Sequence, residues 1–224
     1  MWHRRVTYKS VNRLLTEMGY IAQRFGSDYF TFWDETFTAN KKRLAEFCSK
    51  YNIPAKWRCD TRADAINEDM VVMMKNSGCG QMSLGLESGD NETLKYIHKG
   101  ETTDDFIKAA EILNKHGIQW KAYMIIGFPI DTEDSILKSI EFVKSLNPFR
   151  ITLSFFTPYK GTPLYDEVLS MGLITEHYDT ALFSHQSPHN YFCPRIAKER
   201  YFELRKIVSK DIDSYNKNAL EVWK

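Results

Sequence analysis

Polar side chains and glycines recur at five points along the chain, each directly after a run of residues that favours a β-strand. The points are Asp34-Glu35, Arg62, Glu87-Ser88, Gly127 and Thr157. A carboxylate can accept hydrogen bonds from an ammonium group or from ribose hydroxyls, and the forked guanidinium of Arg62 suits a carboxylate. Gly127 and Thr157 would leave backbone groups free for the edge of an adenine ring. The set therefore matches a ligand that carries an amino group, a carboxylate and a ribose.

These residues also have ordinary structural explanations. Arg62 could pair with Asp60 or Asp64 on the surface, and Gly127 could serve a plain turn between a strand and a helix. Their recurrence in order, one set at each predicted strand end, favours the ligand.

The elements that position these residues alternate between strands and amphipathic helices. Strands are expected at residues 29–33, 56–60, 81–86, 121–126 and 151–156. Helices are expected at about residues 10–25, 41–51, 67–76, 91–97, 103–116, 131–146 and 197–215, with another starting near Pro163. Such alternation is typical of an α/β fold with a parallel sheet and right-handed crossovers. The carboxyl ends of its strands are where ligands bind.

One face of the predicted sheet is polar. In the second strand Lys56, Arg58 and Asp60 alternate with Trp57 and Cys59. Parallel strands covered on both faces read instead as continuous apolar runs. A flat sheet with one solvated face would explain the pattern, and so would a curved, partly closed barrel with a polar lumen. The chemistry at the strand ends favours the barrel.

Composition narrows the function classes. The chain has 224 residues with 30 basic and 29 acidic side chains, so the net charge of +1 argues against a nucleic-acid partner. No apolar run is long enough to span a membrane, and the first residues lack the apolar core of a signal peptide. We therefore expect a cytoplasmic protein with a small-molecule substrate.

The cysteines and histidines give no clear metal motif. Cys48, Cys59, Cys79 and Cys193 lie far apart in sequence, and we expect them to be reduced and mostly buried. The spacing His185-x3-His189-x3-Cys193 permits zinc, but Pro188 and Pro194 disfavour a helix there. We expect these residues to belong to a loop over the site, and no metal ligand is predicted.

Taken in order, the motifs resemble the radical S-adenosylmethionine (radical SAM) superfamily over about residues 5–165. They are Phe30-Thr-Phe-Trp-Asp-Glu-Thr-Phe37, Arg62-Ala-Asp64, Met74-Lys-Asn-Ser-Gly-Cys79, Gly85-Leu-Glu-Ser-Gly89, His98-Lys-Gly100, Met124-Ile-Ile-Gly-Phe-Pro129 and Thr157-Pro-Tyr-Lys-Gly-Thr162. The chain is most similar to the branch that often follows a cobalamin-binding domain, which includes anaerobic magnesium-protoporphyrin IX monomethyl ester cyclase.

The resemblance implies a fold and a site. The fold is a partial (β/α)6 TIM-like barrel that lacks its first strand, with residues 1–174 as the truncated core and residues 175–224 as a C-terminal loop and helical extension. It implies that Glu35, beside Asp34, contacts the methionine amino group, although Trp33-Asp34 replaces two family glycines, and that Arg62 meets the methionine carboxylate. Glu87 and Ser88 would contact ribose, Gly127 and Thr157 would flank adenine, and Lys99 would be a basic residue near them.

The resemblance also implies cofactors that this chain does not hold by itself. The family binds a [4Fe–4S] cluster on three cysteines of a CxxxCxxC loop, and this sequence has no such loop. Residues 2–10 resemble the segment that follows that loop, so we expect a fragment of a longer enzyme rather than a gene product that begins late. A cobalamin domain upstream is a further option.

The intact enzyme would use one electron from the cluster to cleave S-adenosylmethionine into methionine and a 5′-deoxyadenosyl radical. It would need an electron donor, and its outcome would be an oxidoreductase, methyl-transfer or cyclisation reaction on a substrate that these residues do not name. The chain alone is expected to be inactive, and no catalytic residue is assigned. Two other classes remain: a non-catalytic binding or scaffold module, and a barrel enzyme that binds a divalent ion through Asp34, Glu35 and Glu87.

Overall fold

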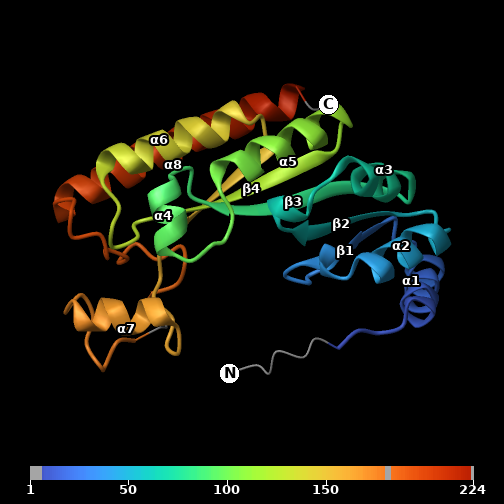
Figure 1. Ribbon diagram of the computed structural model, residues 1–224, viewed down its shortest axis with the longest axis horizontal. Helices are drawn as coiled ribbons and strands as arrows, with labels where there is room; N and C mark the ends of the chain where they lie inside the picture. The colour runs from blue at the N-terminus through green and yellow to red at the C-terminus, as the bar shows by residue number, and fades with distance from the viewer. Residues whose placement is uncertain (1–6, 180–182, 223–224) are drawn as a thin grey trace. The chain divides into compact units, whose positions relative to one another are not determined.

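The computed structural model describes residues 7–179 and 183–222. Its strands are β1 (Tyr29–Thr31), β2 (Lys56–Thr61), β3 (Cys79–Glu87), β4 (Gln119–Ile126) and β5 (Arg150–Phe155). They form one sheet in the order β1-β2-β3-β4-β5, and the pairs β1–β2 and β2–β3 are parallel. At least one helix separates each consecutive pair of strands (Figure 1). The predicted α/β class is therefore confirmed.

All the predicted helices are present. They are α1 (Val11–Phe25), α2 (Lys41–Lys50), α3 (Glu68–Asn76), α4 (Asn91–Tyr96), α5 (Thr103–Lys115), α6 (Glu133–Ser145), α7 (Pro163–Ser170) and α8 (Lys198–Val222). Most begin where a side-chain oxygen accepts a backbone N–H: Ser10, Asn40, Asn67, Asp90, Thr132 and Thr162. Helix α8 runs beyond its predicted end at residue 215, and β1 ends two residues before its predicted end.

The described structure divides into two compact units. The first consists of residues up to 85 and residues 107–121. Its core is an aromatic cluster in which Phe37, Phe47 and Trp57 are almost fully buried, and the indole N–H of Trp57 donates to the Ser77 carbonyl at 2.8 Å. Trp57 and Cys59 are buried in β2 whereas Lys56 is exposed, so the predicted polar face of this strand is confirmed.

The second unit consists of residues 86–106 and residues from 122 onward. Its helices α6 and α8 lie side by side in Figure 1, and Lys144 joins them through an ion pair with Asp211 at 2.9 Å. One hydrophobic cluster of this unit gathers around α7 and the segment after it, and its buried members are Phe128, Phe156, Tyr165, Val168, Ile174, Tyr178 and Phe192. The division predicted between residues 174 and 175 stays a prediction.

Side chains and backbone from the C-terminal part of the second unit cover the outer edge of β5. Asn216 of α8 accepts from the Ile151 N–H at 2.8 Å and donates to the Ile151 carbonyl at 2.9 Å. Gln186 donates to the Leu153 carbonyl at 2.7 Å, and the His185 carbonyl accepts from the Phe155 N–H at 2.8 Å. These bonds satisfy the groups with which another strand would pair.

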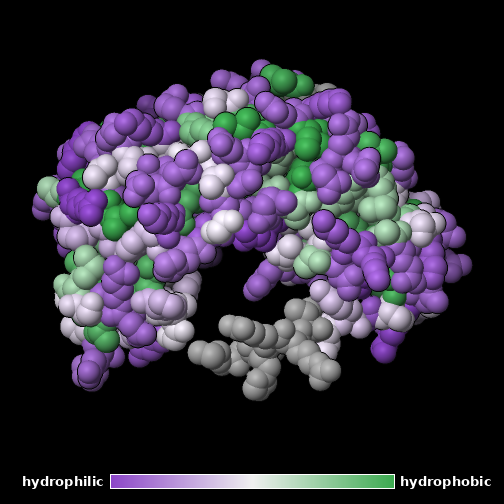
Figure 2. Space-filling model, in the orientation of Figure 1, coloured by the Kyte–Doolittle hydropathy of each residue, from purple (hydrophilic) through white to green (hydrophobic). Residues whose placement is uncertain are grey.

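The four cysteines are free and buried, as predicted. His185 and His189 are exposed while Cys193 is fully buried, and no three metal-ligating side chains converge within the described ranges. None of the helices described here is both long and apolar enough to cross a bilayer. The face drawn in Figure 2 is largely hydrophilic, with hydrophobic residues dispersed over it.

Candidate functional site

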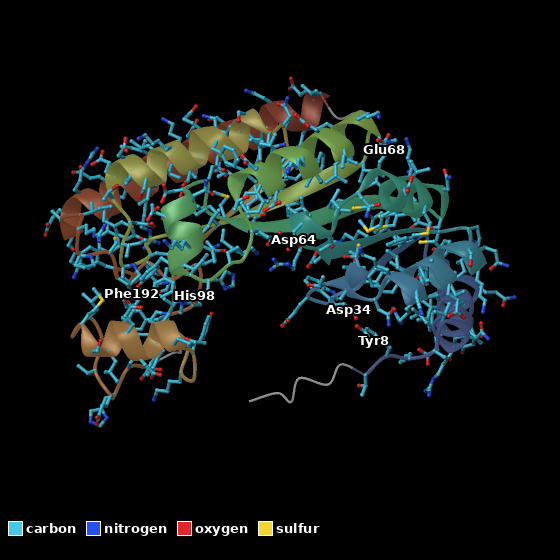
Figure 3. The ribbon with its side chains drawn as sticks, viewed as in Figure 1. Tyr8, Asp34, Asp64, Glu68, His98 and Phe192 are labelled. Carbon is cyan, nitrogen blue, oxygen red and sulfur yellow. The ribbon has the colours of Figure 1, made fainter. Side chains whose placement is uncertain are left out.

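The first unit places Asp34, Glu35 and Arg62 just after the carboxyl ends of β1 and β2. Both carboxylates are exposed in the turn after β1, where Figure 3 labels Asp34. Arg62 forms a two-pronged pair with Asp64, with Nε to Oδ1 at 3.0 Å and a terminal nitrogen to Oδ2 at 2.7 Å. This ion pair is partly exposed and contributes about 1 kcal/mol or less. A ligand carboxylate with the same fork geometry can therefore compete for Arg62.

The second unit holds the other predicted residues, and Glu87 is the most unusual. It ends β3 with a left-handed φ of 65°, and the Ser88 N–H donates to the Leu86 carbonyl at 2.8 Å across it. A three-residue turn of this kind is strained for a residue with a side chain, and such strain gathers at functional sites. The backbone here thus sets the direction in which the Glu87 side chain leaves the end of β3.

Lys99 lies beside that carboxylate. Its ammonium is 3.7 Å from Glu87 Oε1 and 3.3 Å from Glu101 Oε2. Burial raises the pKa of Glu87, and the nearby Lys99 opposes that rise. The structure thus brings together two predicted residues, Glu87 and Lys99, in one partly buried charged cluster that can accept hydrogen bonds.

Ser88 has a structural partner. Its hydroxyl lies 3.1 Å from that of Ser139 in α6 and accepts from the Asp90 N–H at 3.1 Å. Its predicted ribose contact stays a prediction. Gly89 follows, and a Cβ there would lie 2.7 Å from Phe142 Cδ1 and 2.9 Å from Ser139 Cα. The Ser-Gly pair therefore seats α6 tightly against the end of β3.

Gly127 lies after β4 with φ 93°, and a Cβ on it would lie 2.2 Å from the Tyr201 hydroxyl. Its N–H donates to Asp131 Oδ2 at 2.8 Å, and the Phe128 N–H donates to the same oxygen at 3.0 Å. The expectation that Gly127 leaves its backbone free is therefore wrong for the N–H, because the buried Asp131 carboxylate already uses it.

Asp131 is the first functional candidate that the sequence analysis missed, since it figured there only as the start of a helix. Burial raises its pKa to about 6, while the two N–H donors and Thr93 oppose the rise. The signal was a carboxylate four residues after Gly127, the glycine that follows β4. Its role is to fix the turn that carries Gly127.

Thr157 follows β5, and its side chain is also engaged. Its hydroxyl donates to the Phe155 carbonyl at 3.1 Å and accepts from Asn190 Nδ2 at 2.8 Å. Asn190 is the second residue missed. It lies in the segment expected to form a loop over the site, where no spacing or motif pointed to it.

The sequence profile of the Radical SAM superfamily matches residues 1–143. An uncharacterized methyltransferase of Pyrococcus horikoshii is 30% identical over 74% of this chain and 37% of its own length. The anaerobic magnesium-protoporphyrin IX monomethyl ester cyclase of Rubrivivax gelatinosus is 23% identical over 70% of this chain and 29% of its own. The match thus spans between 29% and 37% of the lengths of these two relatives.

Among solved structures, the radical S-adenosylmethionine methyltransferase TsrM from Kitasatospora setae, with cobalamin and a [4Fe–4S] cluster bound, matches with a TM-score of 0.64. The match covers 73% of this chain and 32% of TsrM at 16% identity, so it bears on the fold alone. The resemblance first recognised in the strand-end motifs is confirmed by the profile match over most of the chain. The chain belongs to the radical S-adenosylmethionine superfamily.

Proposed function

We propose that these residues form the S-adenosylmethionine-binding part of a longer radical SAM enzyme that acts on a small molecule by methyl transfer, cyclisation or another redox reaction. Glu87 carries the proposal: it is a partly buried carboxylate beside Lys99, on strained backbone at the end of β3. Such strain persists only where the surrounding structure enforces it. The methyltransferase and cyclase names of the relatives support the reaction classes.

The cysteines of this chain do not fit an iron–sulfur cluster. All four are buried in packing, and burial raises the pKa of Cys48 and, to about 12, that of Cys193. A cluster needs thiolates at fixed spacing, which these environments disfavour. We infer that the cluster ligands lie outside these 224 residues, and that the chain alone does not cleave S-adenosylmethionine.

The proposed ligand contacts are those expected from the sequence. Asp34 and Glu35 face the amino group, Arg62 the carboxylate, and Glu87 and Ser88 the ribose, with Lys99 near them. Thr157 and Gly127 flank the adenine, Gly127 without its N–H, which Asp131 binds. An electron donor and a cobalamin domain complete the intact enzyme. The cobalamin-bound structural neighbour supports the latter.

Calorimetric titration of the purified chain with S-adenosylmethionine tests this proposal. We expect saturable binding that weakens about tenfold or more in Glu87→Gln, because a carboxylate that accepts from ribose forms stronger hydrogen bonds than an amide. Arg62→Ala should lose affinity in the same way.

The matched control is Glu92→Gln, an equally small change at an exposed carboxylate in the first turn of α4. It should leave the dissociation constant unchanged. Two results would contradict the proposed site. One is a wild-type chain that shows no saturable binding, and the other is a Glu87→Gln variant that binds like wild type.

A further inference from the structure

The segment after α7 holds the backbone that follows β5 through one buried side chain, Asn190. Its side-chain nitrogen lies 2.8 Å from Thr157 Oγ1, 2.9 Å from the Ser184 carbonyl and 3.1 Å from the Phe156 carbonyl. Only the –NH2 end of an amide can face three acceptors, so these contacts fix which way the amide points. Thr157 in turn donates to the Phe155 carbonyl, so the hydrogen bonds of Asn190 extend to the last residue of β5.

Asn190 is itself held by Arg205 of α8. One guanidinium nitrogen of Arg205 donates to the Asn190 carbonyl at 3.1 Å, and another donates to the Ser187 carbonyl at 3.0 Å. The guanidinium carbon lies 3.5 Å from the centre of the Phe155 ring. A buried charge is stabilised by such hydrogen bonds and by the facing aromatic ring, so Arg205 ties residues 187–190 to β5.

The same face of α8 reaches the end of β4. Tyr201 lies one helical turn before Arg205, and its hydroxyl occupies the space beside Gly127. Asn190 and two residues of α8, Tyr201 and Arg205, therefore contact the ends of β4 and β5 in the second unit. Ligands in parallel α/β folds bind at these ends.

We propose that Asn190 is a positioning residue for the adenine of S-adenosylmethionine, acting through the backbone at Phe156 and Thr157. This inference rests on the proposed function. Adenine presents a donor at its 6-amino group and an acceptor at N1, while hypoxanthine presents the opposite pair. A backbone held in one place can tell them apart, and one that is free to shift can adapt to either.

The test compares the dissociation constants of S-adenosylmethionine and S-inosylmethionine for the whole chain. Wild type should prefer the adenosyl compound. Asn190→Asp replaces the donating –NH2 by an oxygen that faces carbonyl oxygens. It should weaken S-adenosylmethionine binding about tenfold, the loss expected for one hydrogen bond. It should also bring the ratio of the two dissociation constants closer to one. A merely structural defect would weaken both ligands alike.

Gln186→Glu is the matched control. It makes the same amide-to-acid change in the same segment, and its contact on β5 is Leu153 rather than the strand end. It should leave both constants within about twofold of wild type. Arg205→Lys keeps a charge but loses one prong of the contact, so it should lower the preference less than Asn190→Asp does.

The outcomes separate the two proposals. If wild type binds and Asn190→Asp keeps its affinity and preference, the positioning role is overturned and the binding site stands. If wild type binds neither compound, the proposed function falls and the positioning role falls with it. If Asn190→Asp does not fold, Arg205→Lys decides: an unchanged preference overturns the role.

Discussion

At the residue scale, two carboxylates at the strand ends lie where backbone strain or burial makes a carboxylate unfavourable. Glu87 occupies a left-handed backbone conformation and is partly buried, and Asp131 is buried against two backbone N–H groups. The sequence predicted Glu87 because a motif contains it. Asp131 was missed although its two N–H partners are local, at Gly127 and Phe128. Asn190 could not be predicted, because its partners lie in other elements and are known only once the chain has folded.

The strain at Glu87 predicts an unusual ranking of substitutions. Glu87→Gly should be more stable than Glu87→Ala by about 1 kcal/mol in urea unfolding, because only glycine adopts a φ of 65° without steric cost. At Glu111, an exposed position inside α5, the order should reverse by a similar amount. Equal stabilities of the two Glu87 variants would show that the turn relaxes and stores no strain.

Asp131 predicts a pH dependence of stability. Its pKa is about 6 when folded against an ordinary value of 3.8, so the folded state binds the proton more tightly than the unfolded state. Its contribution therefore makes the protein more stable as the pH falls from about 6 to about 4, by on the order of 2–3 kcal/mol. Above pH 6 the buried charge weakens the fold.

Thermal unfolding across this pH range measures the effect. Asp131→Asn keeps an oxygen for the two N–H donors and cannot ionise, so the difference in unfolding free energy between the variant and wild type should vary with pH. Asp213→Asn, at an exposed carboxylate inside α8, should track wild type throughout. A pH-independent difference for Asp131→Asn would mean that Asp131 does not titrate in this range.

At the element scale, local signals were sufficient to place the helices and strands. Ser10, Asn67 and Thr132 cap helices where the sequence predicted their starts. The sequence placed the end of β1 too late. The Phe32 N–H still donates to the Arg58 carbonyl of β2, but the regular pairing of the two strands has already ended at Thr31. A pattern of side chains cannot show where hydrogen bonding stops.

The contact between α6 and the end of β3 predicts the cost of one methyl group. Gly89→Ala should destabilise the protein by about 1–3 kcal/mol, because the new Cβ meets the backbone of Ser139 as well as the Phe142 ring. Gly19→Ala, inside α1 with open space around it, should stabilise by about 0.5–1 kcal/mol. Chemical unfolding of both variants checks the opposite signs, and a neutral Gly89→Ala would contradict the close packing.

At the scale of the whole molecule, the fold class followed from the alternation of strands and helices, and the family followed from the order of motifs at successive strand ends. The roles of the C-terminal residues did not follow, because their contacts span long sequence separations: Arg205 reaches Ser187 and Asn190, and Asn216 reaches Ile151. The segment predicted as an extension therefore completes the second unit. Amide side chains in irregular segments leave no periodic trace in a sequence.

The covered edge of β5 has a consequence for how copies of this chain can associate. Sheets polymerise into fibrils when each copy offers two open margins, since every addition then exposes a new one. Here the β5 margin is closed by Asn216, Gln186 and the His185 carbonyl, while no strand in the described ranges pairs with the far side of β1. The closed β5 edge leaves each copy at most one edge for strand pairing, so growth of that kind would stop at two copies, a self-terminating assembly.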